Sequence, residues 1–200
     1  MNMAHSTAVP DGFESKWKQP NRGVVGMSCL IVAESAIFII FVVAYIYNLG
    51  KSLTGPTPSQ VLELPILGTV CLLSSSLTVH LAVSALQKGN ARRYITSLST
   101  TILLGAIFLI TTGREWYHLI HDEGLTLQTN LFGTTYFSLV GLHAAHVLVG
   151  LLLLSIALIV SLAGLGTEKH SERVEVLSMY WHFVDAIWVV VFLVVYVLGR

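Results

Sequence analysis

The chain has 200 residues, of which 54% are hydrophobic and 11% are charged, and its mean hydropathy is +0.74. A soluble domain carries about a quarter charged residues, so this composition excludes an ordinary soluble domain and predicts an integral membrane protein. The formal net charge is zero and gives no indication of nucleic-acid binding. No stretch alternates apolar and polar residues, which argues against an outer-membrane β-barrel.

Five apolar runs follow a polar amino-terminal arm, and each reaches the roughly 20 residues that cross a bilayer core. We expect the arm, residues 1–23, to be cytoplasmic, and residues 24–200 to form an all-α membrane domain of five transmembrane helices. Cys29 and Cys71 lie far apart within apolar runs, so we predict that both are small buried residues rather than a disulfide or metal framework. The predicted spans cover residues 24–49, 64–86, 94–119, 131–162 and 174–198.

Basic residues concentrate on one side of these spans, and one of them, Arg114, falls inside the third span. The opposite side has only Lys51 and Arg200. By the positive-inside rule, we expect the amino terminus in the cytoplasm and the carboxyl terminus outside. The eight basic residues on the amino-terminal side are Lys16, Lys18, Arg22, Lys88, Arg92, Arg93, Lys169 and Arg173.

A small set of ionisable side chains lies inside the spans, where exposure to lipid is costly. His143 and His146 are three residues apart and project from one helical face, as do His182 and Asp185. At about 1.5 Å per residue, Glu34 reaches a depth similar to that of His146, His182 and Asp185, so these four could meet. We expect the set to point inward and find partners, with Asp185 accepting from His182 and its neighbours. The set comprises Glu34, Glu115, His143, His146, His182 and Asp185.

The residues alone leave three interpretations of this set open. It could be a proton-handling or regulatory network, because imidazole titrates near neutral pH. It could equally be a hydrogen-bonded interior that fixes the register of the helices. A metal or haem site would draw on His143, His146 and His182, but a pair three residues apart cannot clamp one haem from both sides. We therefore expect no metal ligand among these histidines, and the first two interpretations stay open.

Two segments carry a more specific signal. Residues 141–150, GLHAAHVLVG, resemble the G-F-H-G-L-H-V-x-x-G segment of subunit III of the haem–copper oxidases. Residues 180–192, YWHFVDAIWVVVF, are similar to that family's Y-W-H-F-V-D-x-x-W stretch. The matches occur in the family order, and five spans are similar to the short bacterial form of this subunit.

Two shorter matches extend the resemblance to the first and third spans. Glu34, within AESAIF, matches the family's S-E-x-x-x-F, with Ala33 in place of serine. Glu115 and Trp116 match Q-x-x-E-Y/W, with Thr112 in place of glutamine. The four matches together lie on four of the five predicted spans.

The resemblance implies a multi-pass subunit of a proton-pumping terminal oxidase in the bacterial inner (cell) membrane. It implies that this chain holds no redox cofactor, that haem and copper belong to partner subunits, and that phospholipid binds in a V-shaped cleft between two groups of helices. Subunit I is the expected neighbour, with subunit II in the same complex, and the chain is not expected to catalyse a reaction alone. Carried over by position, Glu34 and Arg114 are candidates for the lipid cleft, and the six ionisable residues listed above match buried polar positions.

The expected function is to stabilise subunit I and to support proton uptake and access of oxygen and lipid, with electrons passing from cytochrome c to oxygen. A ubiquinol oxidase is the first alternative, and the accessory protein associated with nitric oxide reductase is the second. A haem b membrane anchor is a third alternative, from a different class. A proton-coupled transporter is disfavoured, because neither inverted repeats nor broken helices occur.

Overall fold

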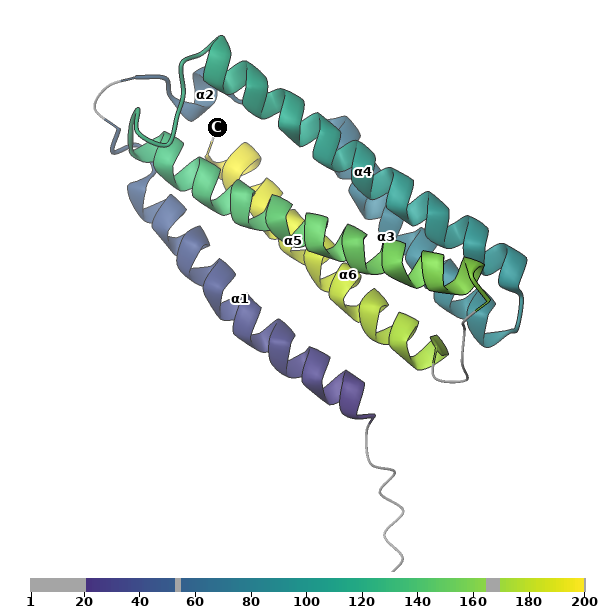
Figure 1. The fold of residues 1–200 in the computed structure, drawn as a ribbon. Coiled ribbons are helices and arrows are strands. Elements are labelled where there is room, and N and C mark those ends of the chain that lie inside the picture. The colour runs from purple at the N-terminus through teal and green to yellow at the C-terminus, as the bar shows by residue number, and fades with distance from the viewer. Residues whose placement is uncertain (1–20, 53–54, 165–169, 200) are drawn as a thin grey trace, which may run out of the picture.

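The computed structural model describes residues 21–52, 55–164 and 170–199, and these residues contain helices and no strand. Five helices are long and apolar enough to cross a membrane, so the prediction of an all-α membrane protein with five spans is confirmed. Four of the basic residues and most of the amino-terminal arm lie outside the described residues, so the predictions made for them are not examined by the structure. These basic residues are Lys16, Lys18, Lys169 and Arg200. The long helices are α1 (Arg22–Asn48), α3 (Ile66–Gln87), α4 (Ala91–His121), α5 (Leu131–Leu162) and α6 (His170–Phe192), and α6 continues as η1 (Leu193–Leu198) (Figure 1).

Side-chain caps set the starts of several helices. Asn21, Asn90 and Asn130 each accept a hydrogen bond from a backbone N–H in the first turn of α1, α4 and α5, which satisfies a donor that has no partner within the helix. The helix α4 therefore begins at Ala91 and includes Arg92 and Arg93, which the apolar run omits. A short helix, α2 (Pro58–Val61), interrupts the connection between α1 and α3.

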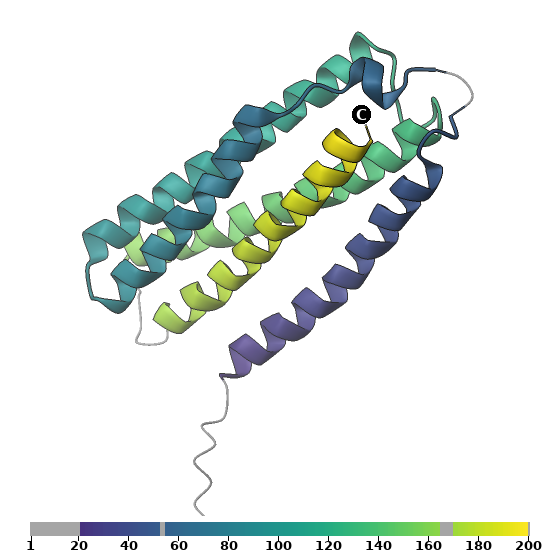
Figure 2. The same ribbon diagram turned by 180° about the vertical axis from the view of Figure 1, so that it is seen from behind.

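The helices form one continuous bundle in which α5 and α6 contact each other. On one side α1 packs against both of them, and on the other α3 and α4, which pair closely, contact α6 and α5 respectively (Figures 1 and 2). We call the end where α1, α4 and α6 begin the N-terminal end of the bundle, and the opposite end, which carries α2, its C-terminal end. The predicted lipid-holding cleft between two helix groups stays a prediction.

Glycines allow the central helices to approach each other around Trp181, whose side chain is fully buried. A Cβ atom added at Gly105 of α4 would lie 2.9 Å from the Trp181 ring, and one added at Gly150 of α5 would lie 2.8 Å from it. The indole N–H of Trp181 donates to Ser75 of α3 over 2.8 Å. Ser75 therefore links α3 to α6.

The outward faces of the helices are apolar, as a lipid or protein environment requires. Val32 and Ile40 of α1 are 71% and 66% exposed. Cys71 is half-buried, but Cys29 is exposed on α1, so the prediction that both cysteines are buried is wrong for Cys29. Its position follows from the rotation of α1, which turns only a narrow stripe toward α5 and α6.

Candidate functional site

The carboxylate of Glu34 on α1 meets the imidazole of His146 on α5. Glu34 Oε2 lies 3.2 Å from His146 Nε2, and the two side chains are 24% and 15% exposed. His146 Nδ1 lies 2.8 Å from the carbonyl oxygen of Leu142. A carbonyl only accepts, so Nδ1 must carry a proton, and one further proton lies between Nε2 and Oε2. The pair therefore shares a proton that either residue can hold.

His143, one turn away on α5, is fully buried within an aromatic cage. Its ring stacks on Trp188 with 5.0 Å between centroids, and the edges of Phe38 and Phe108 complete the cage. Neither ring nitrogen has a hydrogen-bond partner among the described residues. The expectation that His143 finds a polar partner is therefore not met within the described part of the chain, and its contacts are aromatic.

His182 and Asp185 of α6 both face α3, but they do not bond to each other. His182 Nδ1 lies 2.6 Å from the Ser76 hydroxyl of α3. Asp185 is 4% exposed, and neither of its carboxylate oxygens has a hydrogen-bond partner within residues 21–52, 55–164 and 170–199, although Ser76 is close by. The expectation that Asp185 accepts from His182 is wrong, because the rotation of α6 directs His182 to a serine.

Glu115 on α4 is held by two phenols from other helices. Tyr136 of α5 and Tyr196 of η1 both donate to its Oε1, over 3.0 Å and 2.8 Å. The two hydroxyl oxygens lie 3.3 Å apart. These contacts link α4, α5 and the end of α6 at the C-terminal end of the bundle.

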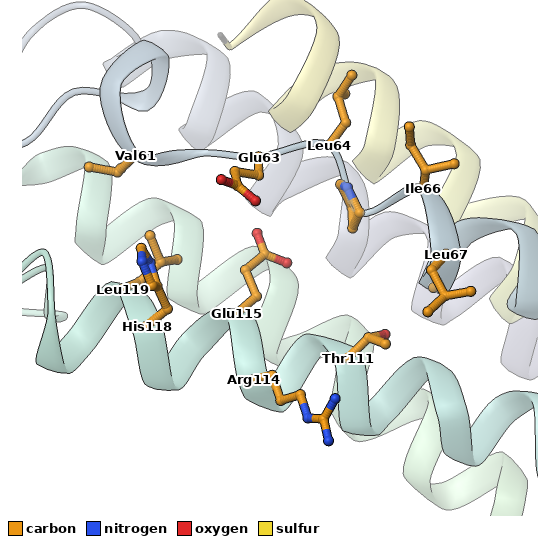
Figure 3. A pocket seen from close by; sticks show the side chains of 12 residues that line it. Val61, Glu63, Leu64, Ile66, Leu67, Thr111, Arg114, Glu115, His118 and Leu119 are labelled. Atoms are coloured by element: carbon orange, nitrogen blue, oxygen red, sulfur yellow. The ribbon is translucent and has the colours of Figure 1, made fainter.

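A cavity of about 350 Å³ lies beside Glu115, between α4 and the segment that leads into α3. Glu63 and Glu115 point toward one another across it, and His118 lies beside them (Figure 3). Arg114 lines the same cavity with its guanidinium directed away from the two carboxylates. Glu34 lies between α1 and α5 and does not line this cavity, so the two candidates for the lipid cleft occupy different places.

The six predicted residues thus occupy separate places rather than one cluster. Of the four expected at one depth, only Glu34 and His146 are in contact. Among the described residues, no group of three or more His, Cys, Asp or Glu side chains is arranged to hold a metal ion. Sequence reasoning missed the polar partners Ser76, Tyr136, Tyr196 and Glu63. A tyrosine within an apolar run was the available signal, since a buried phenol needs a hydrogen-bond partner.

The chain is similar to known proteins along most of its length. The family model described as "Cytochrome c oxidase subunit III" matches residues 17–200. Cytochrome c oxidase subunit 3 of Alkalihalophilus pseudofirmus is 32% identical over 97% of this chain and 95% of its own length. The protein of that name from Synechocystis is 34% identical, over 97% of this chain and 83% of its own length.

A relative that is named for ubiquinol instead of cytochrome c is as similar to this chain as the two proteins above. Cytochrome bo(3) ubiquinol oxidase subunit 3 of Pseudomonas aeruginosa is 34% identical over 88% of this chain and 85% of its own length. Residues 17–200, which the family model matches, include the helices that carry Glu34, Glu115, His146 and Asp185. The chain therefore belongs to the cytochrome c oxidase subunit III family, whose members are subunits of haem–copper oxidases.

Proposed function

We propose that this chain is the non-redox subunit III of a bacterial proton-pumping terminal oxidase that passes electrons from cytochrome c to oxygen. The family match over residues 17–200 carries this proposal. It is supported by the near-equal length of the relative from Alkalihalophilus pseudofirmus, which carries the name of the cytochrome c enzyme. In this proposal the haems and copper belong to the partner subunits, and this chain contributes packing surface and polar side chains.

The chain stabilises subunit I by packing a helix face against it, with subunit II in the same complex. The exposed apolar face of α1 offers such a surface, as Val32 and Ile40 illustrate with exposed fractions of 71% and 66%. Phospholipid occupies the apolar surface that remains. The guanidinium of Arg114, exposed near the C-terminal end of α4, suits a lipid phosphate.

The chain supports proton uptake through the buried polar residues. Glu34 and His146 are the strongest pair for this role, because they share a proton and remain partly exposed. Glu115, His143, His182 and Asp185 complete the proposed network. Access of oxygen and lipid follows the apolar surface between α1 and its neighbours.

The amino terminus faces the cytoplasm of the bacterial cell and the carboxyl terminus the outside. The described basic residues at the N-terminal end of the bundle support this orientation, since the cytoplasmic side of a membrane protein is enriched in them. Lys51 lies at the opposite end. The residues at the N-terminal end are Arg22, Lys88, Arg92, Arg93 and Arg173.

Purification of the complex through a tag on this chain tests the proposal. We expect two larger oxidase subunits to copurify, a haem absorption spectrum of the complex, and oxygen uptake that is faster with reduced cytochrome c than with ubiquinol. The reverse donor preference would favour the ubiquinol oxidase, which the similarity to the Pseudomonas aeruginosa protein keeps as the second candidate. A Soret band in the isolated chain would instead support a haem b anchor and overturn the proposal.

A further inference from the structure

Asp185 is the most isolated polar side chain of the bundle interior. It is 4% exposed, and both of its carboxylate oxygens lack a hydrogen-bond partner in the described part of the chain. Nearly all buried polar groups in proteins are satisfied, and leaving one unsatisfied destabilises the folded state. A carboxyl group in this position indicates an occupant that the side chains do not supply, such as a bound proton or water.

A row of polar side chains leads from Asp185 to the surface of α3. The Ser76 hydroxyl lies close to Asp185 and 2.6 Å from His182 Nδ1. His80 is exposed one turn further along α3 and lies near His182 of α6. Residues four apart lie on the same helical face, so Ser76 and His80 line one side of α3.

The acidic and histidine side chains of α1 and α5 make their described contacts with residues other than Asp185. Glu34 of α1 pairs with His146 of α5. His143 of α5 stacks on Trp188, and the Tyr180 hydroxyl donates to the carbonyl oxygen of His146. The described residues supply Asp185 with no ion pair, so the row on α3 is its connection to the surface.

We propose that Asp185 is a proton-binding site that exchanges with the membrane surface at the N-terminal end of the bundle through Ser76, His182 and His80. A proton taken up at His182 Nε2 releases the proton on Nδ1 to the Ser76 hydroxyl, which passes its own proton to the Asp185 carboxylate. The Nε2–H bond of His182 and the O–H bond of Asp185 form while the Nδ1–H bond breaks, and the Ser76 hydroxyl gives up one proton and gains one. Each proton that enters therefore ends on Asp185 and leaves His182 as its other neutral tautomer. The inference deepens the proposed support of proton uptake by naming a site and an entry residue, His80, outside the Glu34–His146 pair.

The site is tested by infrared spectroscopy of the full chain in lipid, following the C=O stretching band of protonated carboxyl groups during exchange from water into D₂O. We expect one component of this band to be absent in Asp185→Asn, a substitution of nearly equal size. Circular dichroism and thermal unfolding establish that the variant is folded. A carboxyl band identical to that of the unsubstituted chain would overturn the site.

The route is tested by the rate at which the Asp185 component exchanges. We expect several-fold slower exchange in Ser76→Ala and in His80→Gln, because each removes a donor or acceptor from the row. His118→Gln is the matched control, since His118 is also exposed on a long helix but lies at the C-terminal end beside Asp122, and it should exchange at the original rate. Equal exchange rates in His80→Gln and His118→Gln would overturn the route. Neither result depends on donor preference or copurification, so failure here is distinguishable from failure of the proposed function.

Discussion

Glu34 and Glu115 are both carboxylates within membrane-spanning helices, and the bundle accommodates them differently. Glu34 sits between α1 and α5, is 24% exposed on its side chain, and bonds to one titratable partner, His146. Glu115 sits where α4, α5 and η1 meet and accepts from two buried phenols, Tyr136 and Tyr196.

The difference lies in what each partner can exchange. An imidazole and a carboxyl group can each hold the proton of the hydrogen bond between them, so the contact of Glu34 with His146 contains a transferable proton. A phenol has an ordinary pKa of about 10 and stays protonated, so the Tyr136 and Tyr196 hydroxyls act as fixed donors that tie three helices together. The comparison leads us to propose that the hydrogen bonds of Glu115 mainly stabilise the bundle, whereas the Glu34–His146 pair is the better candidate for proton exchange.

The largest effect is expected from Glu115→Ala. Both phenols would lose their acceptor while they remain buried, and a hydrogen bond to a charged group contributes about 1.5–3 kcal/mol. We expect the free energy of unfolding to fall by about 3 kcal/mol, measured by thermal unfolding in detergent. Glu115→Gln keeps a carbonyl acceptor and should lose less than half as much. Equal losses in the two variants would contradict the role of the phenols.

A smaller effect is expected from removing one phenol hydroxyl at a time. Tyr136→Phe and Tyr196→Phe should each lower the free energy of unfolding by about 1 kcal/mol. Combined with Glu115→Gln in a double-mutant cycle, each should show a coupling energy of about 0.5 kcal/mol or more, because the side chains are in direct contact. Additive losses would place the stabilisation outside this cluster.

Glu34→Ala should change function more than stability. A partly exposed ion pair contributes about 0–1 kcal/mol, so the free energy of unfolding should fall by less than about 1 kcal/mol. We expect the oxidase to assemble but to lose activity sooner during turnover, as measured by oxygen uptake over time. Glu63→Ala, a carboxylate in the other region, is the control. Inactivation kinetics equal to those of the unsubstituted complex would remove Glu34 from this role.

The smallest effect on stability is expected from Asp185→Leu. Neither carboxylate oxygen of Asp185 has a hydrogen-bond partner among the described residues. In the structure no described side chain loses a bond, and a buried charged group replaced by an apolar one of similar volume is often neutral or stabilising. We expect the free energy of unfolding, measured by thermal unfolding, to change by no more than about 0.5 kcal/mol. A loss comparable to that of Glu115→Ala would show that Asp185 is bonded after all.

The sequence predicted the helices better than it predicted the partners. The span over residues 131–162 coincides with α5, because apolar runs and their breakers are local features. Depth along the helices predicted that Glu34 and His146 could meet, and they do. Depth also predicted that His182 and Asp185 could join them, because it does not report which way a helix is rotated. Tyr136 and Tyr196 were missed because a tyrosine counts as apolar in a hydropathy pattern, although its hydroxyl is polar.

By itself, the sequence determined the membrane class, the five spans and the ionisable residues that lie within them, since length, hydropathy and composition are properties of consecutive residues. Only the tertiary structure decided that Glu34 meets His146, that two phenols hold Glu115, that His182 bonds to Ser76, and that His143 and Asp185 lack a described hydrogen-bond partner. These outcomes depend on how far each helix is rotated and which neighbour it touches. A few tens of degrees of rotation exchange one facing residue for another, while the hydropathy of the helix stays the same.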